Sequence, residues 1–279
     1  MISGLDPQFL ARPLAHRGLH TDNKGVLENS QSAFAAAIKK GYGIELDLQL
    51  SADGQAMVFH DDTLDRMTSH QGPVRNHSAK NLERMALKHS SDCILPLAAL
   101  LHQISGSVPL LIELKDQTGD LSSSNGDLER ATAKALQHYQ GAVAVMSFNP
   151  FSVLEMRRQA PQIARGLTTE FFTKEEWPKI SKDKRSTLTN ISDFEKCGAS
   201  FISHHHEDLE SAPVRALKAK GIPILCWTIE TKAQQHAARH GIGGQQVPQS
   251  PSDKDRQQGK WHKWYADNCQ RRNRHHPEQ

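Results

Sequence analysis

The 279-residue chain has no run of about 18 apolar residues, which excludes a helix long and apolar enough to cross a membrane. Its first residues, MISGLDPQFLARP, lack the basic segment and apolar segment of a signal peptide. The four cysteines are scattered without a CxxC pair, which argues against a zinc site and against a disulfide framework. No GxGxxG or Walker sequence opens a helix, so a nucleotide-binding fingerprint is also missing. These absences predict a reduced, cytoplasmic protein without stable membrane anchoring.

The net positive charge of the chain comes entirely from its C-terminal end. Residues 1–240 contain 27 Lys and Arg against 27 Asp and Glu, whereas residues 241–279 contain seven basic and four acidic residues. The main body therefore offers no basic excess for nucleic acid, and we expect no nucleic-acid partner. We expect residues 1–240 to form one domain and residues 241–279 to be an irregular basic tail, either disordered or an altered C-terminus.

Short apolar runs alternate with helical patterns along the main body. The runs cover residues 13–15, 43–50, 108–114, 142–146, 163–167, 199–202 and 222–227. Because strands that alternate with helices form parallel sheets, and polar residues follow several runs, the pattern predicts an α/β fold, a TIM (β/α)8 barrel with its site at the C-terminal rim. A doubly wound open sheet is the alternative. No eighth apolar strand follows Gly241, so closure of the barrel is the weak point of this prediction.

Residues 61–95 are polar and irregular, and we interpret them as an insertion after the second strand, with a short helix near residues 79–87. Before the second strand, Asn29 is a suitable N-cap for a helix that ends at Gly41.

Three acidic residues stand in apolar runs. Glu45 and Asp47 are two residues apart, so on a strand they share one face, and Glu113 is likewise paired with Lys115. Neighbouring carboxylates need positive charge between them, and a hard cation such as Mg²⁺ or Ca²⁺ prefers oxygen ligands. The alternative for Glu45 and Asp47 is an exposed edge strand with solvated acids.

Further polar residues fall where strands are predicted to end. His16 and His60 have the chemistry of a general base and a general acid, and Arg17 and Lys115 can bind an anion. Together with the acids they indicate metal-assisted phosphoryl transfer or hydrolysis. The run His204-His205-His206 also falls near the predicted rim; a second metal or substrate contact and a solvated loop are both possible, and base rates favour the loop.

These residues resemble the glycerophosphodiester phosphodiesterase family over about residues 12–240. The matching segments occur in the family's order and spacing: His16-Arg17-Gly18, Glu28-Asn29-Ser30, Glu45-Leu46-Asp47, Asp53-Gly54, Phe59-His60-Asp61, Leu64-Asp65-Arg66, Ile112-Glu113-Leu114-Lys115, Ser147-Phe148 and Cys226-Trp227-Thr228.

The resemblance implies a metal-dependent enzyme on a TIM barrel. Glu45, Asp47 and Glu113 would be the ligands of Mg²⁺ or Ca²⁺, and His16 and His60 the acid–base pair. The other implied roles are phosphate binding by Arg17 and Lys115, arrangement of the metal side by Glu28, and the wall of the glycerol pocket by Trp227. In the family's mechanism the glycerol 2-hydroxyl attacks phosphorus, and water opens the cyclic phosphate to sn-glycerol 3-phosphate.

Two alternatives to this function stay open. A lysophospholipase D would use the same barrel with an apolar groove beside Trp227. A catalytically compromised barrel would follow if the C-terminus left the sheet unclosed.

Overall fold

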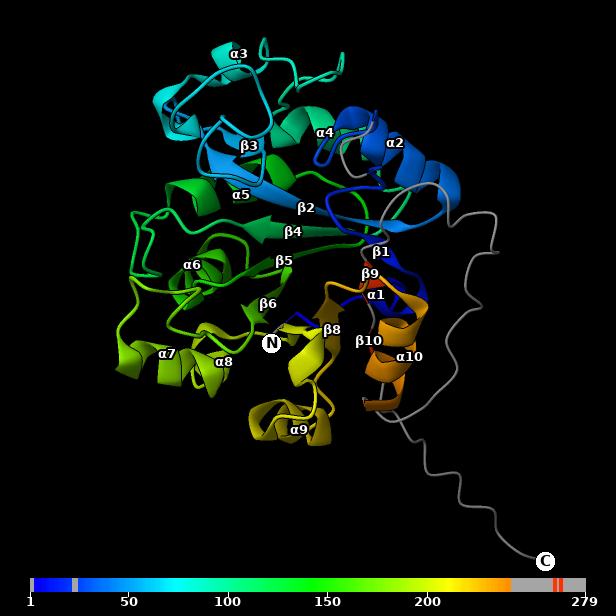
Figure 1. Ribbon diagram of the computed structural model, residues 1–279, viewed down its shortest axis with the longest axis vertical. Coiled ribbons are helices and arrows are strands. Elements are labelled where there is room, and N and C mark those ends of the chain that lie inside the picture. Colours follow the sequence, from blue (N-terminus) through cyan, green and yellow to red (C-terminus); the bar gives the residue numbers. More distant parts are fainter. Residues whose placement is uncertain (1–2, 22–24, 242–262, 265, 268–279) are drawn as a thin grey trace, which may run out of the picture.

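A curled, largely parallel sheet forms the centre of the computed structural model, which describes residues 3–21, 25–241, 263–264 and 266–267 (Figure 1). Seven parallel strands lie in the order β1-β2-β4-β5-β6-β7-β8. Their bounds are Leu14–Ala15 (β1), Gly43–Leu50 (β2), Leu110–Leu114 (β4), Val143–Ser147 (β5), Ala164–Thr169 (β6), Phe201–His205 (β7) and Ile224–Trp227 (β8). All seven predicted strands are present, and the α/β barrel prediction is confirmed.

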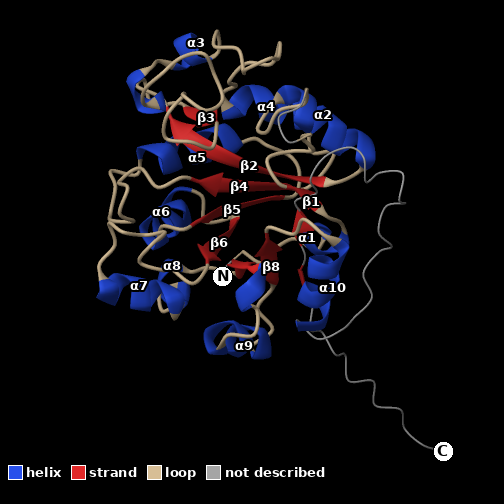
Figure 2. Ribbon diagram, viewed as in Figure 1, coloured by secondary structure: helices blue, strands red, loops and turns tan. Residues whose placement is uncertain are grey.

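Helices surround the sheet (Figure 2). They are α1 (Gln8–Ala11), α2 (Gln31–Lys40), α3 (Ala79–Leu82), α4 (Leu97–Ile104), α5 (Asp127–Leu136), α6 (Pro150–Gln159), α7 (Lys182–Thr189), α8 (Phe194–Cys197), α9 (Ala212–Ala219) and α10 (Lys232–Gly241), with 3₁₀ turns at Val74–Asn76 (η1) and His206–Asp208 (η2). Gly41 ends α2 with φ of 69°, as predicted from its position.

The two faces of the strands pack in different places. Ile44, Leu46 and Leu48 of β2 are fully buried against helical residues such as Phe34 and Leu100. The opposite face lines the interior of the barrel, and its lower layer is an apolar cluster that includes Leu111, Met146, Phe201 and Leu225, closed by Phe9 of α1. Because parallel strands are covered on both faces, their sequences are continuous apolar runs.

Large and small residues alternate inside the barrel. A Cβ atom on Gly166 would lie 2.3 Å from the ring of Phe201, on the neighbouring strand. Glycine is therefore required opposite this phenylalanine, because a side chain there would overlap the ring.

Short antiparallel segments lie between β1 and β8. Lys263–Trp264 (β9) pairs with β1, and Ala266–Asp267 (β10) pairs with β8. As predicted, the described residues contain no eighth parallel strand. The edges of the sheet at β1 and β8 are nevertheless both paired, with β9 and β10. The rest of the predicted tail, residues 242–262 and 268–279, lies outside the described residues.

Residues 61–95 leave the barrel after β3 (Ala56–Val58), which pairs antiparallel with β2. They contribute to a separate apolar cluster with Met57, Leu64, Leu82 and Ile94, so the segment has its own small core. The helix predicted near residues 79–87 is shorter than expected and ends at Leu82, because the chain turns back there to pair near Ala86 and Cys93. In the described residues, none of the helices is both long and apolar enough to span a membrane.

Candidate active site

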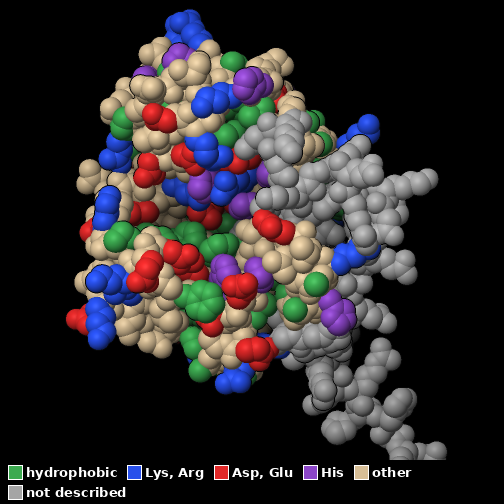
Figure 3. All heavy atoms as spheres, viewed as in Figure 1, with side chains coloured by type: hydrophobic (Ala, Val, Ile, Leu, Met, Phe, Trp, Pro, Cys, Tyr) green, Lys and Arg blue, Asp and Glu red, His purple; other side chains and the backbone are tan. Residues whose placement is uncertain are grey.

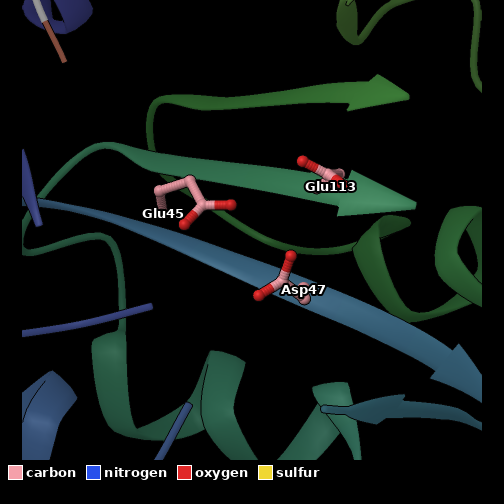
Figure 4. A group of neighbouring side chains, drawn as sticks. All are labelled: Glu45, Asp47 and Glu113. Carbon is pink, nitrogen blue, oxygen red and sulfur yellow. The ribbon is translucent and has the colours of Figure 1, made fainter. Parts of the chain in front are cut away.

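The three predicted metal ligands meet inside the barrel (Figure 4). Glu45 and Asp47 come from β2, and Glu113 comes from β4 at the position paired with Asp47. Each offers a carboxylate oxygen within 4.8 Å of the other two, and all three side chains are buried. The alternative of solvated acids on an edge strand is therefore wrong, since β2 lies between β1 and β4.

Glu45 is the least satisfied of the three acids. Its Oε2 accepts the backbone N–H of Arg17 at 2.8 Å, while its buried Oε1 has no hydrogen-bond partner in the described part of the chain. Burial, followed by the charges of Asp47 and Glu113, raises the pKa of Glu45 well above its usual value. An unpaired buried oxygen beside two further carboxylates is the environment that a hard cation would relieve.

Lys115 and Arg17 provide the positive charge around Asp47. The Lys115 Nζ lies 2.8 Å from Asp47 Oδ1 and 2.5 Å from Glu113 Oε1, and the Arg17 Nε lies 3.4 Å from Asp47 Oδ2. Burial raises the pKa of Asp47, but the charges of Lys115, the nearby histidines and Arg17 outweigh it and hold the pKa far below its usual value. Asp47 is therefore ionised, and the single positive charge of Lys115 is shared between two of the three acids.

Asn29 was interpreted as a helix cap, and that prediction is wrong. Ser30 caps α2 by accepting the N–H of Ala33, while Asn29 turns into the site with φ of 51°. Its side chain donates to Asp47 Oδ2 at 2.8 Å and accepts the backbone N–H of Asp47 at 3.2 Å. Asparagine tolerates left-handed backbone, and its amide supplies both a donor and an acceptor, so it fixes the Asp47 carboxylate.

The two histidines approach the acids from different elements. His16 follows β1, and its Nε2 lies 4.0 Å from Glu45 Oε2. His60 follows β3, and its Nδ1 lies 2.7 Å from Asp61 Oδ1. When Nδ1 carries the proton that Asp61 accepts, Nε2 of His60 is the nitrogen left for a substrate.

A single arginine connects Asp61 to the other side of the site. Arg66 donates through Nε and one terminal nitrogen to both oxygens of Asp61, at 2.6 and 2.8 Å. The same guanidinium donates to both oxygens of Glu28, at 2.6 and 3.1 Å, and Glu28 accepts from Arg17 at 3.0 Å. Glu28 therefore holds two arginines, and through Arg17 it is connected to Asp47 of the acidic cluster.

Trp227 lies at the end of β8, in an aromatic region. Its Nε1 donates to the carbonyl of Ser203 at 3.0 Å, and its ring packs edge-on against Phe148 and His205, with centroids 5.5 and 5.2 Å apart. Charged and histidine side chains gather in the middle of the face shown in Figure 3, with hydrophobic side chains next to them.

The histidine run at the end of β7 is not simply a solvated loop. His204 is buried, with Nδ1 2.7 Å from Thr169 Oγ1 and Nε2 3.1 Å from Asp208 Oδ2, whereas His205 and His206 are half-buried. His204 therefore fixes the start of η2 from inside the protein, and no second group of metal-ligating side chains occurs there in the described chain.

Sequence reasoning missed Asn29, Asp61 and Arg66 as parts of the site. All three stand in segments that carried the family resemblance, directly next to or near a predicted site residue. Only the fold shows what they contact, because Arg66 is 38 residues from Glu28 in the chain.

Comparison with known proteins identifies the family of this chain. A sequence profile described as the glycerophosphoryl diester phosphodiesterase family matches residues 16–242. A glycerophosphodiester phosphodiesterase of Caldanaerobacter subterraneus subsp. tengcongensis is 26% identical over 240 residues, which cover 83% of this chain and 91% of that protein.

Two solved structures share the fold. One is a phosphodiesterase of Oleispira antarctica in complex with the product sn-glycerol-3-phosphate, with a TM-score of 0.68, 23% identity and coverage of 84% of this chain and 90% of that chain. The other is a glycerophosphodiester phosphodiesterase of Thermotoga maritima, with a TM-score of 0.61, 21% identity and coverage of 82% and 90%. The profile match spans more than half of the sequence, and the chain belongs to the glycerophosphoryl diester phosphodiesterase family.

Proposed function

We propose that this protein hydrolyses glycerophosphodiesters to sn-glycerol 3-phosphate and an alcohol. The observation that carries the proposal is the buried group Glu45, Asp47 and Glu113 with two histidines and two cationic side chains beside it. An Oleispira antarctica phosphodiesterase of the same fold has been solved with that product. The substrate would be a small soluble molecule.

Glu45, Asp47 and Glu113 would hold one divalent cation, Mg²⁺ or Ca²⁺. The donors fit such an ion because all are carboxylate oxygens and because Glu45 Oε1 lacks a partner. When bound, the ion supplies Lewis-acid stabilisation of negative charge on the phosphoryl oxygens.

Arg17 and Lys115 would hold the phosphate. Both side chains are partly exposed, at 19% and 16%, while their acidic partners are almost fully buried. Their outer N–H groups can therefore meet an anion that arrives at the rim, and a planar guanidinium matches phosphate oxygens well.

His16 and His60 would be the acid–base pair. One imidazole takes the proton from the glycerol 2-hydroxyl as that oxygen bonds to phosphorus, and the other protonates the alkoxide as its bond to phosphorus breaks. The cyclic phosphate is then opened by water with the proton transfers reversed, which yields glycerol 3-phosphate. Asp61 would hold His60 in one tautomer throughout, and Trp227 would wall the glycerol pocket.

The cytoplasm is the proposed location. Cys93 and Cys197 are free thiols, and burial raises the pKa of Cys197 to about 11, which keeps that thiol inert. A reducing compartment suits such cysteines.

The test is release of glycerol 3-phosphate from glycerophosphocholine, glycerophosphoethanolamine and glycerophosphoglycerol, with Mg²⁺ or Ca²⁺ added to chelator-treated protein. Turnover of at least one substrate that disappears in Glu45→Ala supports the proposal. A folded sample that turns over none of them would reject it, and faster turnover of a lysophospholipid would favour the lysophospholipase D alternative. A broad melt at low temperature would favour the compromised barrel.

A further inference from the structure

A buried carboxylate that the mechanism does not use lies at the end of β6. The side chain of Glu170 is only 9% exposed, and its Oε1 accepts the indole N–H of Trp177 at 2.6 Å. No lysine or arginine in the described part of the chain forms an ion pair with Glu170. It also lies outside the group of three acids that could hold a metal ion.

The surroundings of Glu170 are acidic. Burial is the main cause that raises the pKa of Glu170, and the charges of Glu176 and Glu113 add to it. Ala164 and Gly166 of β6 line the barrel interior, and Glu170, directly after the strand, continues their alternation on the side of the acidic cluster. This environment disfavours a second anion and would be relieved by a cationic ligand.

Aromatic rings from the ends of β7 and β8 and from the loops after β5 and β6 make a connected circuit next to this carboxylate. Phe148 contacts Trp177 and Trp227, with ring centroids 5.4 and 5.5 Å apart. Trp227 contacts His205 at 5.2 Å, and His205 contacts Phe171 at 5.5 Å. Phe171 follows Glu170 directly in the chain, and it is 41% exposed although it is large and apolar.

We propose that Glu170 and this aromatic circuit bind the alcohol part of the substrate and select a quaternary ammonium alcohol such as choline. Trp227 would then stand between this subsite and the glycerol pocket and form a wall of both. The faces of aromatic rings attract a cation, and a neighbouring carboxylate strengthens that attraction. A polyol would instead need several hydrogen-bonding groups, whereas the circuit consists mainly of ring faces and edges. This inference rests on the proposed phosphodiesterase function and adds the substrate class to it.

The position along the sheet fits two adjoining subsites. The predicted metal ligands and phosphate-binding residues stand on β1, β2 and β4, whereas the circuit stands at the ends of β5 to β8. A phosphodiester bound over the acids can therefore direct its leaving alcohol toward the rings.

The experiment compares kcat/KM for glycerophosphocholine with kcat/KM for glycerophosphoglycerol, whose alcohol is neutral. We expect the ratio of the two values to fall about tenfold in Glu170→Gln, in the range of a partly desolvated cation–π and carboxylate contact. Glu175→Gln is the matched control, because it removes the same charge from an exposed side chain on the same loop, and its ratio should equal that of the wild type. Phe171→Ala, at an exposed position that folding does not require, should lower the ratio several-fold.

Choline binding provides a readout that does not depend on turnover. Choline should quench the fluorescence of metal-loaded wild-type protein, through Trp177 and Trp227, and 3,3-dimethylbutanol, its neutral analogue of the same shape, should not. An unchanged ratio in both Glu170→Gln and Phe171→Ala, or equal effects of choline and the analogue, would overturn the proposal. If one of these results is obtained while glycerol 3-phosphate is still released, only the choline proposal is rejected. If none of the substrates is turned over, the phosphodiesterase function itself is rejected.

Discussion

Glu45→Gln should have opposite effects on stability and on activity. In the absence of a metal ion, Glu45 is a fully buried carboxyl group with an unpartnered oxygen and two acidic neighbours. Glutamine has the same shape, keeps an acceptor for the N–H of Arg17, and adds an amide N–H that can donate to a neighbouring carboxylate. The substitution should therefore stabilise the metal-free protein while it removes one ligand of the catalytic ion.

The size of the effect follows from burial. Satisfying a buried polar group is worth about 1–3 kcal/mol, and in a chain of this size each kcal/mol moves the melting temperature by about 2–4 °C. We expect the variant to melt roughly 5 °C higher than the wild type in chelator. A saturating divalent ion should then reverse the order, since an ion at about 100 times its Kd adds about 2.7 kcal/mol to the wild type alone. Activity should fall about a thousandfold, as expected when several kcal/mol of Lewis-acid stabilisation are lost.

Differential scanning calorimetry with chelator and with Mg²⁺ or Ca²⁺ measures both effects on the same samples. Glu129→Gln is the matched control, because Glu129 is also a buried glutamate with an oxygen that has no partner among the described residues, but it lies on α5 and does not belong to the acidic cluster. If Glu45→Gln melts below the wild type in chelator, Lys115 and Arg17 already satisfy the acids and the argument for an ion-binding cluster fails. If the ion raises the melting temperatures of the wild type and of Glu45→Gln equally, it binds outside the acidic cluster.

Three further predictions concern single contacts. Burial raises the pKa of Glu129, so the folded protein binds its proton more tightly than the unfolded chain and stability decreases as pH rises through that range; Glu129→Gln should remove this part of the pH dependence, measured by urea unfolding between pH 4 and pH 8. Asp61→Asn should lower kcat roughly 10–100-fold with little change in KM, because the amide keeps one acceptor oxygen in place of the two that Arg66 and His60 use, and so no longer fixes the tautomer of His60; an unchanged kcat would show that His60 needs no such partner. Arg66→Lys should lower kcat less than Asp61→Asn but weaken substrate binding as well, since a lysine cannot hold Asp61 and Glu28 bidentately at once; steady-state kinetics with all three proteins separates the two effects.

The acidic cluster could be predicted from the sequence because it depends on short-range rules. A spacing of two residues places Glu45 and Asp47 on one face of any strand, and the apolar residues between them identify the strand as buried. Glu113 joins them because β4 is the next parallel strand in the sheet, and the alternation of strands and helices predicts that neighbourhood. Periodicity and the usual order of strands therefore account for the three acids.

The contacts of Asn29 and Arg66 could not be predicted in this way. Asn29 satisfies every local criterion for a helix cap, and the choice of Ser30 instead depends on a left-handed backbone at Asn29. That conformation is retained because the side chain reaches Asp47, a partner 18 residues away. Local propensity was overruled by a tertiary contact, which a pattern in one sequence does not show.

The arrangement of charges explains why these extra residues are needed. Three buried carboxylates would repel one another in a metal-free chain, and the protein keeps all three close together. It places Lys115 between Asp47 and Glu113 and ties Asp47 to Asn29 and Arg17, while Glu45 keeps a buried oxygen without a partner among the described residues. Breaking one buried pair costs more than the pair contributes, because the remaining charge is left without compensation. The residues around the acids are therefore as constrained as the acids themselves, and substitutions at Asn29 or Lys115 should impair folding together with catalysis.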